Sequence, residues 1–218
     1  MKRTLIAGLF SLLFVAVPAF ADPAPVTVQL TGVQGGYQGG VYVTPYYLSI
    51  NGGTPIDVVC DDYTHEVSVG ESWSATISTF ANLADTRWGA SDSQQYDEAA
   101  WLYEQYLDGS ASAGDVNFAI WSLFDPQLNA STPGWDQGVT NLLAGAGQWF
   151  ADGAGGVNFS DFIIITPTDP GPGSAQEYLA VEPTPEPGTL ALMGSGLLLL
   201  GIFARKRFRS AAQTSEAS

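Results

Sequence analysis

The chain has 218 residues, a length that allows one domain with appendages and is ample for a buried core. Its 22 acidic and 7 basic residues give a net charge of −15, which argues against a nucleic-acid binder because neutralising phosphates requires Lys and Arg. The single Cys excludes an internal disulfide framework, and the single His excludes a His-rich metal site. Between Asp22 and Pro187 one basic residue, Arg87, faces 21 acidic ones, so this middle segment carries a charge of −20.

The N-terminus has the three parts of a secretory signal. Lys2 and Arg3 form a basic start, and residues 5–17 form an apolar run that is too short to span a bilayer comfortably. Ala19 and Ala21 supply the small residues of a cleavage site. We therefore expect residues 1–21 to be a signal peptide that is cleaved after Ala21.

The exported segment begins with strand patterns. Alternating apolar and polar residues, or short apolar runs, predict strands at residues 26–30, 41–50, 56–60 and 66–79. Pro45 interrupts the second of these, which predicts a sheet edge or a bulge. Residues 51–53 and Gly70 predict turns, although a bulge at Gly70 is also compatible.

Three helices are predicted next. Apolar residues recur at helical spacing over residues 96–107, 118–123 and 135–150, and the third stretch has the clearest amphipathic stripe. Ser91, Asp92 or Ser93 can cap the first helix and Asp115 the second, which Asp125–Pro126 ends. Further strands are expected at residues 159–166 and 177–181. Strands, then helices, then strands predict an α+β, antiparallel β-rich domain with about three helices over residues 22–181.

The C-terminus has a second three-part pattern. A Pro-Glu-Pro-Gly sequence ends a linker at residues 182–188 and precedes an apolar stretch at residues 189–204, which predicts a short transmembrane helix. A basic cluster follows in residues 205–218, and the positive-inside rule places that tail in the cytoplasm and the acidic middle outside. The motif comprises Pro185, Glu186, Pro187 and Gly188, and the basic cluster comprises Arg205, Lys206, Arg207 and Arg209.

This tail resembles the PEP-CTERM sorting signal of Gram-negative bacteria, which is sometimes labelled after ice-binding proteins that carry it. The resemblance implies processing by exosortase, a membrane transpeptidase that acts near the Pro-Glu-Pro. It also implies an inner-membrane intermediate, then display at the cell surface or secretion, commonly alongside exopolysaccharide production. The chain shows no regular Thr-rich repeat, so ice binding is not inferred.

Cys60 is the residue with the most specific chemistry to weigh. A lone cysteine in an exported chain is a small buried hydrophobe, a reactive thiol or one half of an intermolecular bridge. The early-strand cysteine and the later Ala119-Ile120-Trp121 sequence resemble the thioester domain of bacterial surface adhesins, in which a Cys joins a Gln. Asn117 occupies the glutamine position here, and it is one methylene shorter. Asp61 and Asp62 would also disfavour the thiolate.

Several alternatives accompany Cys60 and Asn117. Asp61, Asp62, His65 and Glu66 could seed a calcium or transition-metal site, although their spacing fits no EF-hand loop. His65 could belong to a Ser-His-Asp triad, but the chain has no Gly-x-Ser-x-Gly elbow. Asp97, Glu98 and Glu104 could be paired glycosidase carboxylates, although an exposed helix face would explain them through solvation.

Aromatic residues suggest carbohydrate stacking, and Trp88 is the tryptophan that falls outside a periodic apolar pattern. Arg87 beside it is expected to form a structural salt bridge in preference to a ligand contact. We therefore expect a non-enzymatic, exported envelope protein without a cofactor, in which Ca²⁺ stays an open possibility. Its expected partners are exosortase, the membrane through the C-terminal helix, and an exopolysaccharide or surface glycan. The alternatives are a covalent adhesin that uses Cys60 and, third, a glycan-active enzyme.

Overall fold

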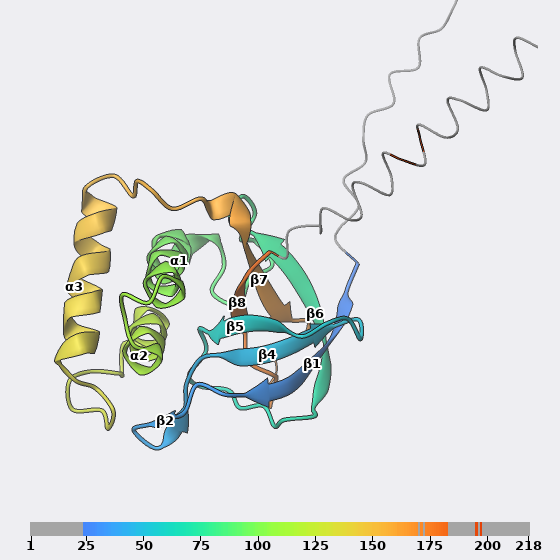
Figure 1. Ribbon diagram of the computed structural model, residues 1–218, viewed down its shortest axis with the longest axis horizontal. Coiled ribbons are helices and arrows are strands. Elements are labelled where there is room, and N and C mark those ends of the chain that lie inside the picture. Colours follow the sequence, from blue (N-terminus) through green and yellow to red (C-terminus); the bar gives the residue numbers. More distant parts are fainter. Residues whose placement is uncertain (1–23, 170, 172, 183–194, 196, 198–218) are drawn as a thin grey trace, which may run out of the picture.

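The computed structural model describes residues 24–169, 171, 173–182, 195 and 197. These residues form an antiparallel β-barrel with three helices packed on one side of it (Figure 1). The expected α+β class, with antiparallel strands and about three helices, is confirmed. The predicted signal peptide, Pro-Glu-Pro motif and basic tail lie outside the described residues, as does the predicted membrane helix apart from Ser195 and Leu197. In the described part of the chain no helix is long and apolar enough to cross a membrane.

Six antiparallel strands close the barrel in the order β1, β4, β5, β8, β7 and β6. The barrel closes because β1 pairs with β4 on one side and with β6 on the other. The late strand β8 enters between β5 and β7, so the last part of the domain completes a sheet begun by the first. The strands are β1 (Val26–Val33), β4 (Tyr46–Ile50), β5 (Ile56–Cys60), β6 (Ser72–Thr79), β7 (Phe162–Pro167) and β8 (Tyr178–Val181).

Two strand predictions need correction. Pro45 lies at neither a sheet edge nor a bulge: it follows a cis peptide bond and directly precedes β4, which is paired on both sides. The irregularity in register lies in β1, between Leu30 and Gly32. The strand expected from residue 66 begins only at Ser72, because Gly70 turns the chain with a φ of 94°.

A small hairpin stands apart from the barrel. It pairs β2 (Tyr37–Gln38) with β3 (Val41–Tyr42), so the predicted strand over residues 41–50 is in fact two strands in different sheets. Between them, Gly39 and Gly40 have φ values of 63° and 97°, the left-handed conformations that a two-residue hairpin turn needs.

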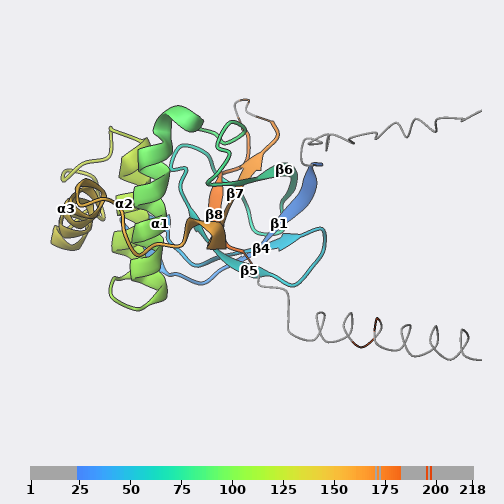
Figure 2. The ribbon, with the colours of Figure 1, turned by 90° about the horizontal axis from the view of Figure 1, so that it is seen from above.

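The helices form two layers on the barrel (Figures 1 and 2). Helices α1 (Ser93–Leu107) and α2 (Ala113–Phe124) lie next to the barrel, and α3 (Gln137–Ala151) lies outside them. This position explains why α3 buries only Val139 and Ala146 completely, although its sequence has a clear amphipathic stripe. Short 3₁₀ turns occupy Ala90–Asp92 and Phe159–Asp161, the latter at the start of the strand predicted from residue 159.

Asp92 occupies the N-cap position of α1, as one of the three expected residues, but without a side-chain capping bond, and the cap of α2 differs from the one expected. Ser112 caps α2, since its hydroxyl accepts a hydrogen bond from the Asp115 N–H at 3.2 Å, and Asp115 itself lies in the first turn. Asp125 follows the last residue of α2, as predicted. Asp136 caps α3 by accepting from two N–H groups, so Trp135 precedes the helix.

Two glycines of α3 offer a matched test of this layering. A Cβ at Gly147 would meet no atom within 4 Å, whereas one at Gly145 would lie 3.1 Å from the Trp101 ring on α1. Gly147→Ala should therefore raise the free energy of unfolding by about 0.5–1 kcal/mol through helix propensity. Gly145→Ala should gain less or lose stability. Urea unfolding measures both, and equal gains would contradict the packing of α3 on α1.

Candidate functional site

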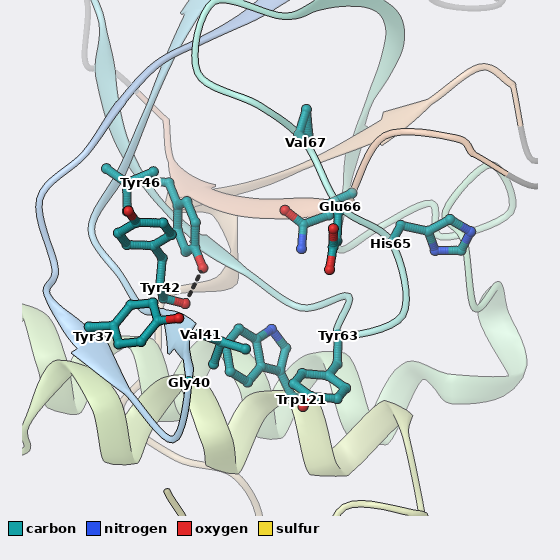
Figure 3. Close-up of a pocket in the computed structure, with 12 residues that line it drawn as sticks. Tyr37, Gly40, Val41, Tyr42, Tyr46, Tyr63, His65, Glu66, Val67 and Trp121 are labelled. Carbon is teal, nitrogen blue, oxygen red and sulfur yellow. Dashed lines mark hydrogen bonds between the residues drawn. The ribbon is translucent and has the colours of Figure 1, made fainter. Parts of the chain in front are cut away.

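A pocket of about 430 Å³ lies beside the loop that follows β5 (Figure 3). Its walls come from the β2–β3 hairpin, from the start of β4, from residues 63–67 and from α2. Five aromatic side chains and three polar ones line it, and we call it the aromatic pocket. The aromatic residues are Tyr37, Tyr42, Tyr46, Tyr63 and Trp121, and the polar ones are His65, Glu66 and Gln176.

The hairpin places two tyrosines at the pocket rim. The glycine turn sets Tyr37 opposite Tyr42 in the hairpin register, and their rings meet edge to face at 5.2 Å between centroids. Both are unusually exposed for aromatic residues, at 68% and 60% of their surface. Each of these rings therefore retains aromatic surface that a ligand could cover.

The floor of the pocket is more buried than its rim. Trp121, on α2, is 2% exposed, and its ring lies 5.2 Å from that of Tyr63. At the other wall, the Tyr46 hydroxyl donates to the Tyr42 carbonyl at 2.7 Å. That bond fixes the start of β4 against the hairpin.

The polar side chains of the pocket differ in their hydrogen-bond partners and in the direction in which they point. The Gln176 amide donates to the Asp62 carbonyl at 3.0 Å and its oxygen accepts from the Tyr178 hydroxyl at 3.0 Å. His65 points away from the pocket centre, whereas the exposed Glu66 carboxylate points toward the aromatic floor in Figure 3. Glu66 is thus the carboxylate that a bound molecule would meet first.

Asn117 connects two backbone segments behind the pocket through hydrogen bonds. Its side-chain oxygen accepts from the Thr44 N–H at 2.7 Å, and its amide donates to the Cys60 carbonyl at 2.9 Å. All three residues are fully buried. One side chain of α2 therefore ties together the segment before β4 and the end of β5.

Cys60 is buried, and its thiol is free of any disulfide bond. It donates to the Asp62 carbonyl at 3.2 Å. Desolvation, followed by the charges of Asp61 and Asp62, raises the pKa of the thiol well above its ordinary value. The structure thus brings Cys60 and Asn117 together, but the amide engages backbone groups and the thiol stays protonated.

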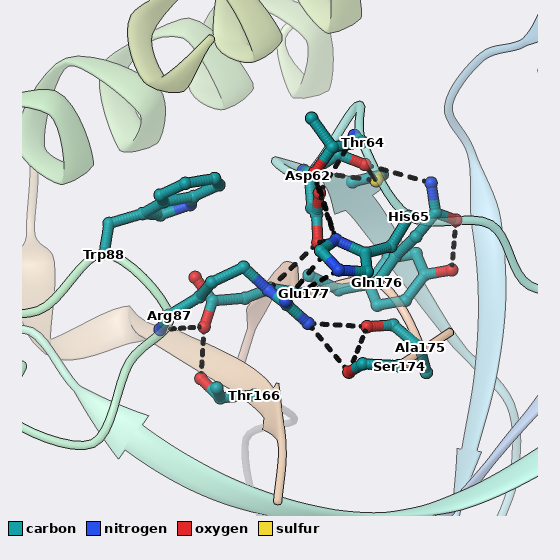
Figure 4. Close-up of polar contacts among 12 residues, drawn as sticks. Asp62, Thr64, His65, Arg87, Trp88, Thr166, Ser174, Ala175, Gln176 and Glu177 are labelled. Atoms are coloured by element: carbon teal, nitrogen blue, oxygen red, sulfur yellow. Dashed lines mark hydrogen bonds and ion pairs between the residues drawn. The ribbon is translucent and has the colours of Figure 1, made fainter. Parts of the chain in front are cut away.

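Asp62 and Arg87 form a buried ion pair beside this turn (Figure 4). Arg87 Nε lies 2.9 Å from Asp62 Oδ2, and His65 Nδ1 donates to the same carboxylate at 2.9 Å. The guanidinium also donates to the Ala175 carbonyl at 2.6 Å and to Ser174 Oγ at 3.1 Å. Arg87 is therefore the structural salt bridge that the sequence favoured.

Asp61 and Glu177 form a second buried centre, in which two carboxyl groups meet away from solvent. Glu177 accepts from the Tyr96 hydroxyl at 2.5 Å, from the Arg87 N–H at 2.7 Å and from the Thr166 hydroxyl. Asp61 lies beside Glu177 without such donors: among the described residues, neither of its buried carboxyl oxygens has a hydrogen-bond partner, which favours the protonated form. Burial first, then the Glu177 charge, raises the pKa of Asp61 well above its ordinary value.

The candidate metal ligands do not converge. Asp61 faces Glu177, Asp62 faces Arg87 and His65, and Glu66 faces the aromatic pocket. Across the described residues, no group of three or more His, Cys, Asp or Glu side chains is placed to hold a metal ion. The proximity in sequence reflects a turn in which each side chain takes a different direction.

Two further expectations are corrected. Glu98 is 7% exposed and accepts from the Gln94 amide at 2.8 Å, so its helix face is not the solvated one that was expected. Asp97 and Glu104 are half-buried. Trp88 is half-buried too, and its ring stacks on Phe124 at 5.4 Å, which removes it as an exposed stacking platform.

Sequence reasoning missed the aromatic pocket and Glu177. A signal for part of the pocket was present, since the Tyr-x-Gly-Gly-x-Tyr order at residues 37–42 predicts a hairpin with facing tyrosines. Glu177 had no such signal. It is a single acidic residue near a strand, and only the barrel closure brings it to Asp61.

Comparison with known protein families identifies one motif in the chain. The PEP-CTERM protein-sorting motif matches residues 183–207. This motif supports an exosortase-sorted extracellular surface protein that is exported to the cell envelope. No curated protein and no solved structure matches the chain, so the resemblance to the thioester domain gains no support from these comparisons.

Replacing Asn117 tests the buried link behind the pocket. Asn117→Ala should leave the Thr44 N–H and the Cys60 carbonyl without partners, and it should lower the free energy of unfolding by about 2–5 kcal/mol. Asn141→Ala, on the exposed side of α3, is the matched control and should change it by less than about 0.5 kcal/mol. Similar values for both variants in urea unfolding would contradict the role of Asn117.

Asp61 should make stability depend on pH. Because its pKa is raised in the folded protein, the proton binds the folded state more tightly, and stability is lost as pH rises above about 4 toward the folded pKa. Asp61→Asn keeps the size and polarity of the side chain but cannot ionise. Its stability relative to the wild type should therefore increase with pH.

Asp108→Asn is the control with the opposite sign. The Ser110 hydroxyl and backbone N–H lower the pKa of the exposed Asp108, so this variant should lose stability relative to the wild type as pH rises. Urea unfolding between about pH 2 and 8 distinguishes the two trends, because the Asp108 effect develops below the ordinary Asp pKa of about 4 and the Asp61 effect develops above it. A pH-independent difference for Asp61→Asn would show that the buried carboxyl does not hold its proton.

Proposed function

We propose that this protein is a non-enzymatic component of the cell surface, in which the barrel domain binds a partner. The sorting motif at residues 183–207 carries the proposal, since it addresses the domain to the envelope. A finer route is part of the same proposal: cleavage of the signal peptide after Ala21, insertion through residues 189–204 and processing near Pro185–Gly188. The basic cluster at residues 205–209 would remain in the cytoplasm.

A binding role is supported by how the reactive groups are used. Arg87 and His65 are paired with Asp62, Asp61 is paired with Glu177, and Cys60 is buried and protonated. General acid–base or nucleophilic catalysis needs such groups within reach of a substrate. The aromatic pocket offers instead contact surface and one exposed carboxylate, Glu66.

Neither alternative function has a specific observation in its favour. A covalent adhesin would need attack of the Cys60 thiolate on the Asn117 amide carbonyl, but that oxygen accepts the Thr44 N–H and the thiol is protonated. A glycan-active enzyme would need two carboxyl groups flanking a substrate site. Asp61 and Glu177 are adjacent, yet both are completely buried.

Removal of the sorting segment tests the localisation. Deleting residues 185–209 should abolish surface display and send the protein to the periplasm or the medium without tail processing. Deleting residues 210–218, which lie beyond the motif, is the control and should leave display intact. Surface labelling of intact cells, with fractionation and immunoblotting, measures both. Unchanged surface retention after the larger deletion would refute the role of the tail.

A further inference from the structure

We infer that the aromatic pocket binds an organic ammonium group. The inference rests on the proposed binding role and names the ligand chemistry of that site. The pocket volume of about 430 Å³ falls in the range of about 300–1,000 Å³ that is usual for small-molecule sites. Its lining combines aromatic rings with a carboxylate, and both attract a positive charge.

The first argument is the charge of the domain. The middle segment has 21 acidic residues and one basic residue, so its field repels anions and concentrates cations. The single arginine, Arg87, already pairs with Asp62 at 2.9 Å. Among the described residues neither Lys nor Arg lines the aromatic pocket, and its histidine, His65, already pairs with Asp62 at 2.9 Å, so an anionic ligand would find no free counter-charge there.

The second argument is the arrangement of the rings. An ammonium group is attracted to the face of Tyr or Trp by the ring quadrupole, and aromatic cages that bind such groups are built on this attraction. Tyr37 and Tyr42 leave most of their surface exposed at one wall, and Trp121 and Tyr63 form the floor. Several rings therefore border the same space (Figure 3).

The third argument is Glu66. Its carboxylate points toward the aromatic floor, and its side chain is exposed. A cation between the carboxylate and the rings would gain a charge pair as well as the ring contacts. A neutral saccharide could stack on the same rings, but it would leave the carboxylate without a counter-charge. The ammonium group thus uses both the rings and the carboxylate of the pocket.

Two matched probe pairs test the charge requirement. The first pair is choline and the uncharged alcohol in which carbon replaces the choline nitrogen. The second is a short glucosamine oligomer and its N-acetylated form, which has the same sugar backbone without the charge. Isothermal titration of the purified protein should give dissociation constants at least about tenfold tighter for the cationic member of each pair.

The probes also separate possible sources of the ammonium group. Tighter binding of the glucosamine oligomer than of choline would assign the site to an amino sugar, and the reverse would assign it to a methylated ammonium headgroup. Equal binding of the acetylated and free-amine oligomers would overturn the proposal in favour of neutral saccharide stacking. Absence of binding by both cations would overturn it as well.

Variants locate the binding in the pocket. Glu66→Gln should weaken choline binding about tenfold, whereas Glu182→Gln, which removes the same charge outside the pocket, should leave it nearly unchanged. Tyr42→Phe keeps the ring and should bind, while Tyr42→Ala should not. If Tyr42→Ala alters thermal unfolding, Tyr37→Ala replaces it, because that ring is 68% exposed.

These measurements are independent of the localisation test. A protein that is displayed normally but binds neither cation would refute the ammonium site and leave the surface role in place. A protein that binds choline but keeps its location after loss of residues 185–209 would refute the sorting proposal alone. Choline binding that survives Glu66→Gln and Tyr42→Ala unchanged would show that the site lies elsewhere, and it would overturn the assignment.

Discussion

The side-chain amide of Asn117 connects α2 to the barrel beside Cys60 and behind the aromatic pocket. It is fully buried, and its two hydrogen bonds satisfy the Thr44 N–H and the Cys60 carbonyl, which would otherwise be buried without partners. A buried amide can accept and donate at once, which a carboxylate or a hydrocarbon cannot do. This explains why a polar residue lies on the most apolar helix of the domain, one turn before Trp121 at the pocket floor.

The turn after β5 shows how an acid-rich chain buries acidic groups. Asp62 is stabilised by the only arginine of the segment, while Asp61 and Glu177 have no second cation in the segment, and burial beside Glu177 raises the pKa of Asp61. Arg87, which pairs with Asp62, also donates to Ser174 and Ala175, and these bonds fix the loop that carries it. The Asp61 N–H donates to the Glu177 carbonyl at 3.3 Å, and this backbone bond holds the end of β5 to the chain before β8. With Asp61 and Asp62 engaged in these ways, Glu66 is the nearby carboxylate that faces the pocket.

The sequence predicted most elements but little of the site. The run at residues 56–60 could be recognised as a buried strand because it is short, mostly apolar and rich in β-branched residues. Helix α1 could be recognised because its apolar residues recur at helical spacing. Closure of the barrel was not predictable, because β8 pairs with β5 across more than a hundred residues. Glu177 and Gln176 depend on that pairing. Tyr37 and Tyr42 depend only on the local glycine turn, which could have been recognised.

Barrel closure also restricts where the tail can be processed. β8 ends at Val181, only two residues before the matched sorting motif begins at residue 183. A cut between the end of β7 and Ser174 would remove the strand between β5 and β7 and with it the backbone bond from the Asp61 N–H to the Glu177 carbonyl. Asp61 would then lose the neighbouring Glu177, and Arg87 would lose its contacts at residues 174 and 175. A cut at Pro185–Gly188 spares all of these, so the position of the motif lets the tail be removed while the barrel and the aromatic pocket stay whole.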